Sequence, residues 1–303
     1  MSDKSTPNII LEKFSKLNRP LVLDGAMGTY LIEKGIKPYR EMWVTLSNID
    51  FPEIVKSVHK DYIFAGAEII TTNTFNSNPV SLELSHYIEK SSEELVQTAV
   101  TLAKQAREET DSDVIIAGCN APAEDCYQHE RTISKQKLEY NHHKHIELLW
   151  AAGVDIIWNE THGHWDEIEI VCEFCENNSL PYAINLYFEE NMKILSGENL
   201  DEIVKRIIEN YPNALIGFNC IAPSHFTEFI ENNFVQKEWG FYLNCGEEGK
   251  HEGEIFCAIS PDVYIEYVKK IINRNTAFIG SCCGSNPQHT KQIKEFLIAE
   301  NYS

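Results

Sequence analysis

Eight short apolar runs recur along the chain, and segments with a helical pattern separate them. Most of these runs lack a regular alternation of apolar and polar residues, as expected for strands of a parallel sheet that is buried on both faces. Eight such strands that alternate with helices predict the α/β class and a (β/α)8 TIM barrel, with a doubly wound open sheet as the alternative. The runs cover residues 21–24, 67–74, 114–119, 154–160, 182–187, 214–220, 240–245 and 276–283.

Helix start and stop signals lie where the barrel pattern needs them. Residues 91–94, Ser-Ser-Glu-Glu, have the sequence of a capping box, and Asn286 followed by Pro287 is typical of a helix N-terminus. Gly66 and Gly153 each stand directly before a strand run, where glycine can end the preceding helix in a left-handed conformation. The helices predicted from these signals include residues 53–65, 91–108 and 138–152.

The formal net charge of −20 limits the kinds of partner. Nucleic-acid binding relies on Lys and Arg to neutralise phosphates, so this charge argues against nucleic acid, and it argues equally against an anionic membrane surface. The polar first twenty residues lack the apolar centre of a secretory signal, and no apolar run approaches a membrane span. We expect a cytoplasmic protein that binds small molecules and forms a single domain over residues 1–303.

Polar side chains occur at the ends of the apolar runs. In a (β/α)8 barrel the chemistry gathers at the carboxyl ends of the strands. Carboxylates, amides and thiols fill a core poorly, so we expect these side chains to line a pocket. They are Asp24, Asn73, Cys119, Glu160, Cys220, Asn244, Cys245, Cys282 and Cys283.

Three of these residues have the pattern of a zinc site. Cys220 ends the motif Ile-Gly-Phe-Asn-Cys, and Cys282 and Cys283 lie in Phe-Ile-Gly-Ser-Cys-Cys-Gly. Adjacent cysteines on a strand point to opposite faces, but Gly280 and Gly284 allow a turn that brings both to one ion. An odd total of nine cysteines in a reducing compartment disfavours disulfides. Three thiolates leave a fourth zinc position open, which indicates a catalytic site that suits a sulfur substrate.

Four motifs, taken together and in this order, resemble those of the homocysteine S-methyltransferase family. The likeness extends from about Pro20 to Ile298. It implies a zinc-dependent (β/α)8 barrel that methylates homocysteine to methionine, in agreement with the barrel predicted from the apolar runs. The motifs are Leu-Asp-Gly-Ala-Met-Gly-Thr at 23–29, Ala-Gly-Ala-Glu-Ile-Ile-Thr-Thr-Asn-Thr-Phe at 65–75, Gly-Phe-Asn-Cys at 217–220 and Gly-Ser-Cys-Cys-Gly at 280–284.

The resemblance assigns roles to the polar strand-end residues. It makes the same three cysteines the zinc ligands. Asp24 and Glu160 would contact the substrate amino acid, most plausibly its ammonium group, and Asn73 would line the same pocket. Asn244 is a candidate for the fourth zinc position or for contacts with the donor. The alternative is a structural role: an Asp-Gly turn for Asp24, an ion pair for Glu160, and a backbone-bridging amide for each asparagine.

The chemistry explains why these residue types are needed. A homocysteine thiol with a pKa of about 8.5 is mostly protonated at neutral pH, and coordination to zinc deprotonates it. The resemblance implies a sulfonium methyl donor for a chain of this size, S-methylmethionine or S-adenosylmethionine, with betaine as the alternative. Methyl transfer to another thiol or selenol, such as selenocysteine, stays open, as does a barrel that binds or senses a sulfur amino acid without turnover.

Three segments depart from the family pattern. Residues 119–126 read Cys-Asn-Ala-Pro-Ala-Glu-Asp-Cys where the family has Gly-Pro with a further glycine. Residues 162–165 read His-Gly-His-Trp in place of a proline-bearing turn, and Leu243 stands where proline is common. These departures leave the zinc ligands unchanged and leave open the identity of the donor and of the acceptor.

Other cysteines and histidines receive structural interpretations. Cys172 and Cys175 share one helical stripe with apolar residues, which favours core packing over a metal or redox motif. His162 and His164 form a loop pair without nearby carboxylates, so we expect them to be solvated. The polar residues 141–145 predict a helix surface. The remaining cysteines are not assigned as ligands: Cys119, Cys126, Cys245 and Cys257.

Overall fold

The computed structural model describes residues 7–39, 42–232, 235, 237–248 and 255–300, so both predicted domain bounds, residues 1 and 303, fall outside the described residues. Eight parallel strands form the main sheet in the order β1-β10-β7-β6-β5-β4-β3-β2. A parallel bridge between Leu23 and Ile69 joins the two ends of this order and closes the barrel. The TIM-barrel prediction is confirmed. The strands are β1 (Leu21–Val22), β2 (Ile69–Thr71), β3 (Ile115–Asn120), β4 (Ile156–His162), β5 (Tyr182–Leu186), β6 (Leu215–Asn219), β7 (Trp239–Leu243) and β10 (Thr276–Ser281).

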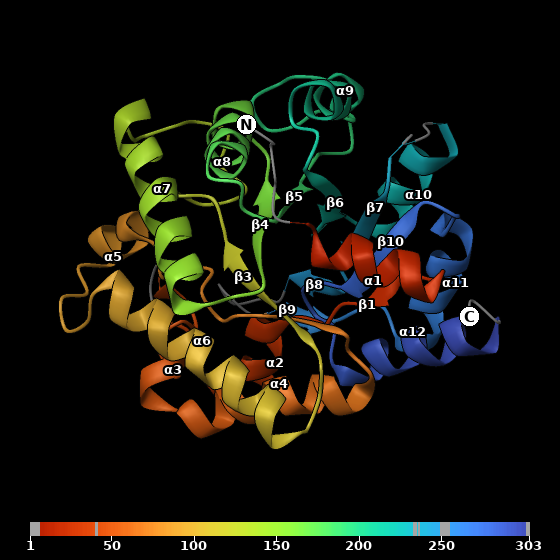
Figure 1. The fold of residues 1–303 in the computed structure, drawn as a ribbon, viewed down its shortest axis with the longest axis horizontal. Coiled ribbons are helices and arrows are strands. Elements are labelled where there is room, and N and C mark those ends of the chain that lie inside the picture. Colours follow the sequence, from red (N-terminus) through yellow and green to blue (C-terminus); the bar gives the residue numbers. More distant parts are fainter. Residues whose placement is uncertain (1–6, 40–41, 233–234, 236, 249–254, 301–303) are drawn as a thin grey trace.

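Helices alternate with the strands and surround the barrel (Figure 1). The predicted signals are confirmed: Ser91 and Asn286 are N-caps, and Gly66 and Gly153 end their helices with φ values of 103° and 82°. The helices that follow the first strand are α2 (Met27–Glu33), α3 (Ser47–Asp50), α4 (Pro52–Ala65), α5 (Pro79–Ser85), α6 (Ser92–Glu109), α7 (Lys135–Ala152), α8 (Trp165–Asn177), α9 (Leu200–Asn210), α10 (Pro223–Asn232), α11 (Pro261–Ile271) and α12 (Pro287–Ala299).

Helix α1 (Ile9–Leu17) lies against the amino-terminal ends of the barrel strands. Its Ile10 is fully buried in the same apolar cluster as the side chains that fill the barrel. The Asn8 side chain donates to the carbonyl of Tyr182, the first residue of β5, over 3.2 Å. The helix therefore covers this end of the barrel and leaves the carboxyl ends of the strands for the site.

Three aromatic rings fill the barrel below the site. Phe278 packs edge-on against Trp158 with ring centroids 4.9 Å apart, and Tyr242 lies next to both. Gly217 and Gly240 make room for the Phe278 ring, because a Cβ at either position would lie within 2.8 Å of ring atoms. The rings form a rigid floor, and Trp158 Nε1 donates to the Tyr242 hydroxyl over 3.0 Å.

The polar segment 141–145 corrects the sequence interpretation. It lies on α7 as expected, but Asn141, His142 and His145 are fully buried instead of solvated. Asn120, at the end of β3, lies 2.9 Å from a ring nitrogen of His145 and 3.3 Å from one of His142. Because a polar strand-end residue supplies hydrogen-bond partners, this helix can bury polar side chains against the sheet.

A short antiparallel hairpin follows the seventh barrel strand, and the sequence pattern did not predict it. Its strands are β8 (Gly246–Glu248) and β9 (Ile255–Cys257). Three-residue strands are too short to give a recognisable periodicity. No helix in the described part of the chain is long and apolar enough to cross a membrane.

The aromatic floor predicts a large stability effect. We expect Phe278→Ala to lower the free energy of unfolding by about 3–5 kcal/mol, because it removes a fully buried ring and leaves a cavity. Denaturant unfolding followed by circular dichroism measures the change. Phe256→Ala is the matched control: this ring is 60% exposed, and its loss should change stability by less than about 0.5 kcal/mol. Equal effects of the two substitutions would contradict the packing argument.

Candidate active site

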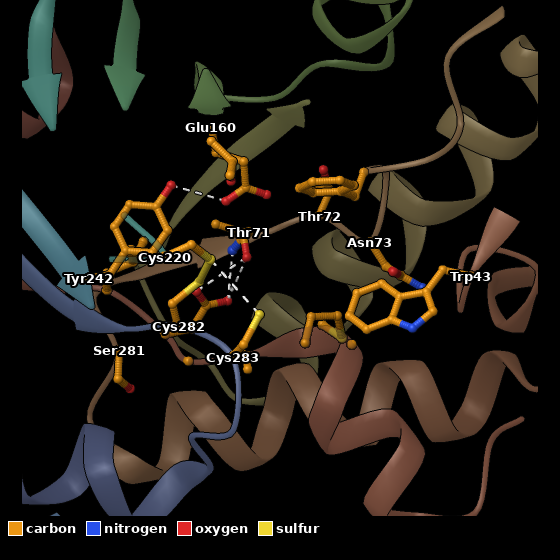
Figure 2. A pocket seen from close by; sticks show the side chains of 18 residues that line it. Trp43, Thr71, Thr72, Asn73, Glu160, Cys220, Tyr242, Ser281, Cys282 and Cys283 are labelled. Atoms are coloured by element: carbon orange, nitrogen blue, oxygen red, sulfur yellow. Dashed lines mark hydrogen bonds between the residues drawn. A yellow bond between two sulfur atoms is a disulfide. The ribbon is translucent and has the colours of Figure 1, made fainter. Parts of the chain in front are cut away.

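A cavity of about 90 Å³ opens among the carboxyl ends of the barrel strands, and we call it the inner cavity. Its wall comes from the ends of β1, β2, β4, β6, β7 and β10 and the loops that follow them, so distant parts of the sequence meet there. Figure 2 shows Cys220, Cys282 and Cys283 grouped together, with Glu160 above them and Trp43 to the right in this view.

The three predicted cysteine ligands lie together. Their sulfur atoms are all within 4.8 Å of one another, and Cys220 Sγ is 3.9 Å from Cys283 Sγ. Cys220 follows β6 directly, and its φ of 56° turns the chain out of the strand. The structure joins Cys220 and Cys282 as a disulfide, contrary to the expectation of free thiols. This pairing follows from the clustering, which places the two sulfurs next to each other.

The turn that presents the adjacent cysteines depends on Gly284 more than on Gly280. Gly284 has a φ of 78°, in the left-handed region that favours glycine. Gly280 lies in β10 without a positive φ, so the turn predicted there is wrong. A Cβ at Gly280 would lie 2.8 Å from the Cβ of Leu23. Glycine at this position instead allows β10 to approach β1 closely.

The sulfur cluster fits a thiolate-bound metal in its reduced form. Two sulfurs that bind one tetrahedral zinc at 2.3 Å lie about 3.8 Å apart, close to the 3.9 Å between Cys220 and Cys283. Burial raises the pKa of Cys283 to about 11, and the negative charge of Glu160 adds to the shift. No Lys, Arg or His is among the described residues that line the inner cavity. Three thiolates at this place therefore need a cation from outside the chain.

Two buried carboxyl groups line the same cavity. Asp24 follows β1, and it accepts hydrogen bonds from the Thr71 amide at 2.8 Å and from the Thr71 hydroxyl at 3.2 Å. Glu160 lies near the end of β4, where the Cys119 thiol donates to Oε1 over 2.6 Å and the Tyr242 hydroxyl donates to Oε2 over 3.0 Å. These donors hold each carboxyl group in one orientation.

Burial controls the charge of both groups. It raises the pKa of Asp24 well above its usual range, against the hydrogen bonds from Thr71, and the charge of Glu160 contributes to the same shift. Burial also raises the pKa of Glu160, against the hydrogen bonds from Cys119 and Tyr242. A buried carboxylate stays ionised when a cation pairs with it. The inner cavity thus favours a ligand that carries a positive charge.

The two predicted asparagines occupy different places. Asn73 lines the inner cavity, and its amide donates to the Val44 carbonyl at 3.2 Å and to Asn48 Oδ1 at 3.2 Å. Its amide nitrogen therefore bridges to the segment before α4. Asn244 is not part of the inner-cavity wall; it lines another cavity that Cys220 also borders, and it accepts from the Gly246 amide at 2.9 Å.

A larger cavity of about 460 Å³ adjoins the inner one, and we call it the outer cavity. Trp43, Phe75, Thr161, Cys220 and Cys283 line both, so the two cavities meet at the sulfur cluster. Acidic and aromatic side chains from residues 124–127 complete the wall of the outer cavity. A second ligand in this cavity would reach the same sulfurs as a ligand in the inner one.

His162 and His164 are buried, so the predicted solvated pair is wrong. His162 Nε2 lies 3.3 Å from the carbonyl of Asn120, and His164 Nε2 lies 2.8 Å from that of Gln128. His162 thus contacts the last residue of β3 and His164 contacts the segment after it, and an isolated sequence motif reveals neither contact. The core packing predicted for Cys172 and Cys175 is confirmed, because both are buried in the main hydrophobic core.

Sequence reasoning missed three side chains that shape the site: Thr71, Tyr242 and Trp43. Thr71 lies two residues before Asn73, and both line the inner cavity, so the strand period of two could have identified Thr71. Tyr242 could not be found in this way, because Asn244, two residues later, lines another cavity. Trp43 precedes α3 and carries no such periodic signal. Its ring lies against Gly28, where a Cβ would come within 2.2 Å of ring atoms.

The fold and the site together define a class of protein. It is a (β/α)8-barrel enzyme whose site combines a cysteine cluster with paired carboxyl groups at the carboxyl ends of the strands. The family model described as homocysteine S-methyltransferase matches residues 21–297. The chain therefore belongs to the homocysteine S-methyltransferase family, and it is a methyltransferase.

Individual relatives are similar over nearly their whole length. The homocysteine S-methyltransferase of Escherichia coli (strain K12) is 26% identical, with 90% of this chain and 94% of that protein aligned. Homocysteine S-methyltransferase 1 of Arabidopsis thaliana is 27% identical, with 95% of this chain and 99% of that protein aligned. The crystal structure of the homocysteine methyltransferase MmuM from Escherichia coli in its metallated form has the same fold, with a TM-score of 0.77, 23% identity, and 95% of this chain and 99% of that chain covered.

The sulfur cluster predicts the effect of removing one ligand. We expect Cys220→Ser to weaken zinc binding by more than about 100-fold, since even outer-shell partners of a metal contribute 10–100-fold. The barrel should stay folded, because its stability depends on a large core and not on the metal. Competition with a chromophoric chelator measures affinity, and circular dichroism checks the fold. Cys257→Ser, at an exposed cysteine, is the control. Wild-type affinity in Cys220→Ser would contradict the three-thiolate site.

Proposed function

We propose that this protein transfers a methyl group from a sulfonium donor, S-methylmethionine or S-adenosylmethionine, to the thiolate of homocysteine at a zinc site, giving methionine. One observation carries this proposal. A cluster of three cysteines and a pair of buried carboxyl groups line one cavity that offers no described basic side chain. An amino acid with a terminal thiol is complementary to both parts.

Asp24 and Glu160 would bind the ammonium group of homocysteine. Ionised and paired with that ammonium, both carboxylates lose the penalty that burial imposes on them in the free protein. Thr71 keeps Asp24 in place, while Cys119 and Tyr242 keep Glu160 in place. The acceptor is thus oriented by groups on four different strands, β2, β3, β4 and β7, and by Asp24 after β1.

Cys220, Cys282 and Cys283 would hold zinc, which when bound supplies a Lewis acid that keeps the substrate thiol deprotonated at neutral pH. The disulfide between the first two must be reduced for this role. Crystal structures of Escherichia coli MmuM exist in metallated and oxidized forms, which supports an interpretation of this cluster in the same two chemical states.

The outer cavity would bind the methyl donor. Trp43, Phe75 and Tyr127 supply aromatic faces, which attract a cation, and Asp125 adds a carboxylate. The donor would then reach Cys220 and Cys283, which line both cavities. A betaine donor would use the same aromatic faces through its quaternary ammonium, and it is the second candidate.

The bonds and charges of the methyl transfer balance without the transfer of a proton. The homocysteine thiolate attacks the methyl carbon of the sulfonium, a new sulfur–carbon bond forms, and the donor bond breaks with its electron pair left on the donor sulfur. The positive charge of the sulfonium and the negative charge of the thiolate disappear together. The protein's contribution is to hold two sulfurs in line and to exclude water from the junction of the two cavities.

Turnover tests this function directly. We expect methionine to form from homocysteine and S-methylmethionine with zinc-loaded, reduced protein, and the rate to fall at least about tenfold after chelator treatment, because little thiolate then exists at neutral pH. S-adenosylmethionine and betaine, each in place of S-methylmethionine, identify the donor, and selenocysteine in place of homocysteine tests the acceptor. Binding of homocysteine without turnover by any donor would instead support a sensor.

The raised carboxyl pKa values predict proton release on substrate binding. An ammonium pairs with the ionised carboxylates, so a group that is protonated in the free site must lose its proton when the amino acid binds. Affinity should therefore rise with pH and fall as the pH is lowered through the raised pKa values. Methionine is the suitable probe, since it lacks a titrating thiol. Calorimetry in two buffers of different ionisation enthalpy counts the protons.

Glu160→Gln should lower methionine affinity by about 10- to 100-fold and reduce the proton release, since a charged hydrogen bond contributes about 1.5–3 kcal/mol. Glu68→Gln is the control, because Glu68 binds Arg19 away from the cavity, and its pKa is lowered by the Arg19 hydrogen bond and the Lys294 charge despite burial. Methionine affinity that does not change with pH would argue against the carboxylate pair as the ammonium site.

A further inference from the structure

The outer cavity has one wall without regular secondary structure. Ala123, Glu124, Asp125, Cys126 and Tyr127 line this cavity, and they belong to the segment 121–134 between β3 and α7. Such a segment lacks the backbone ladder of a strand or the hydrogen bonds of a helix. Its position depends on side-chain contacts, some within the segment, such as Thr132 with Glu124, and others from neighbouring elements.

Glu167, in the first turn of α8, contacts both ends of this segment. Its side chain is fully buried, and Oε1 accepts a hydrogen bond from the Ala123 amide over 2.8 Å. Oε2 accepts from the guanidinium of Arg131 over 2.5 Å, and Arg131 also pairs with Asp166 over 3.0 Å. One carboxylate thus fastens residue 123 at the start of the wall and residue 131 beyond its end.

A third contact fixes the carboxylate itself. His142 Nε2 on α7 lies 2.9 Å from Glu167 Oε1. Burial opposes ionisation of Glu167, but the His142 hydrogen bond and the charges of His142 and Arg131 outweigh it and hold the pKa of Glu167 well below its usual range. Glu167 is therefore an ionised group with three partners, and it has little freedom to move.

The middle of the segment has its own anchor. His164 lies in the turn before α8, and its Nε2 is 2.8 Å from the carbonyl of Gln128. His162, at the end of β4, contacts the carbonyl of Asn120 over 3.3 Å. The segments 119–126 and 162–165, which both depart from the family pattern, are thus in contact with each other.

We propose that Glu167 and Arg131 are positioning residues that hold residues 123–127 as the donor-binding wall, and that they thereby set the selectivity for the methyl donor. This inference rests on the proposed function. Neither residue lines the inner or the outer cavity, so both act through the segment they hold. The carboxyl groups of the inner cavity, Asp24 and Glu160, lie outside this segment, so homocysteine binding should not change when the segment loosens.

The test distinguishes an effect on donor binding from an effect on homocysteine binding. We expect Glu167→Gln and Arg131→Gln each to raise the KM of the sulfonium donor by about tenfold while the KM of homocysteine stays within about twofold. The double variant should be little worse than either single variant, because each single variant already removes the Glu167–Arg131 ion pair. Arg131→Gln keeps the test valid if Glu167→Gln fails to fold, since the Arg131 side chain is 19% exposed.

Glu68→Gln is a matched control. Glu68 also binds one arginine, with Arg19 nitrogens at 2.7 Å from both carboxylate oxygens, and one backbone amide, that of Val22 at 3.1 Å. It lines neither cavity. We expect both KM values to stay within about twofold of wild type in this variant, even if its thermal stability falls as much as that of Glu167→Gln.

Amide hydrogen exchange supplies a measurement that needs no substrate. Residues 123–127 should exchange faster in both anchor variants and at the wild-type rate in Glu68→Gln. Unchanged exchange, an unchanged donor KM, or an equal rise of both KM values would each overturn the proposal. Wild-type protein that neither binds nor uses a sulfonium would overturn the proposed function and, with it, the selectivity role. Faster exchange in that case would show only that the anchor is structural.

Discussion

Closure of the barrel between its first two strands decides where the functional side chains lie. Leu23 bridges to Ile69, and the Asp24 amide donates to the Ile69 carbonyl over 2.9 Å. One residue farther along this seam, the Asp24 carboxylate accepts from Thr71. The contact that completes the ring of parallel strands therefore also orients a site residue. Without it, β1 and β2 would be the two edges of an open sheet, and Asp24 would not be held beside Thr71.

The closed ring gathers groups that repel one another when they ionise. Three thiols and two carboxyl groups share a cavity without a described basic side chain, and burial raises the pKa values of Asp24, Glu160 and Cys283. In the free protein the carboxyl groups and the Cys283 thiol avoid this repulsion by staying protonated. A bound cation would favour their ionised forms, and Cys220 and Cys282 could join in only after reduction of their disulfide. Under the proposed function, one set of acidic groups would therefore favour both a metal ion and a cationic substrate.

The sequence predicted what depends on local pattern. Strand ends could be located from the apolar runs, and the barrel rule then brought Asp24, Glu160 and the three cysteines to one end of the fold. Prediction from the sequence failed where hydrogen-bond partners lie far apart along the chain. His145 and His164 have polar neighbours in the sequence, which suggested exposure to solvent. Only the fold shows that they are buried and that Asn120 and Gln128 are their hydrogen-bond partners. Hydrogen bonds between distant residues leave no periodic trace in either segment.

Two of the segments that depart from the family pattern show the same effect of contacts between distant residues. Residues 119–126 and 162–165 are about forty positions apart, yet each begins at the carboxyl end of one of two neighbouring strands, β3 and β4. These strands are paired from Ala117 with Ile156 to Asn120 with Asn159. Loops that leave adjacent parallel strands at the same edge must pack on each other. A substitution in one loop then changes the hydrogen-bond partners available to the other. The two segments are therefore best regarded as a single structural unit, of which residues 123–126 line the outer cavity beside the sulfur cluster.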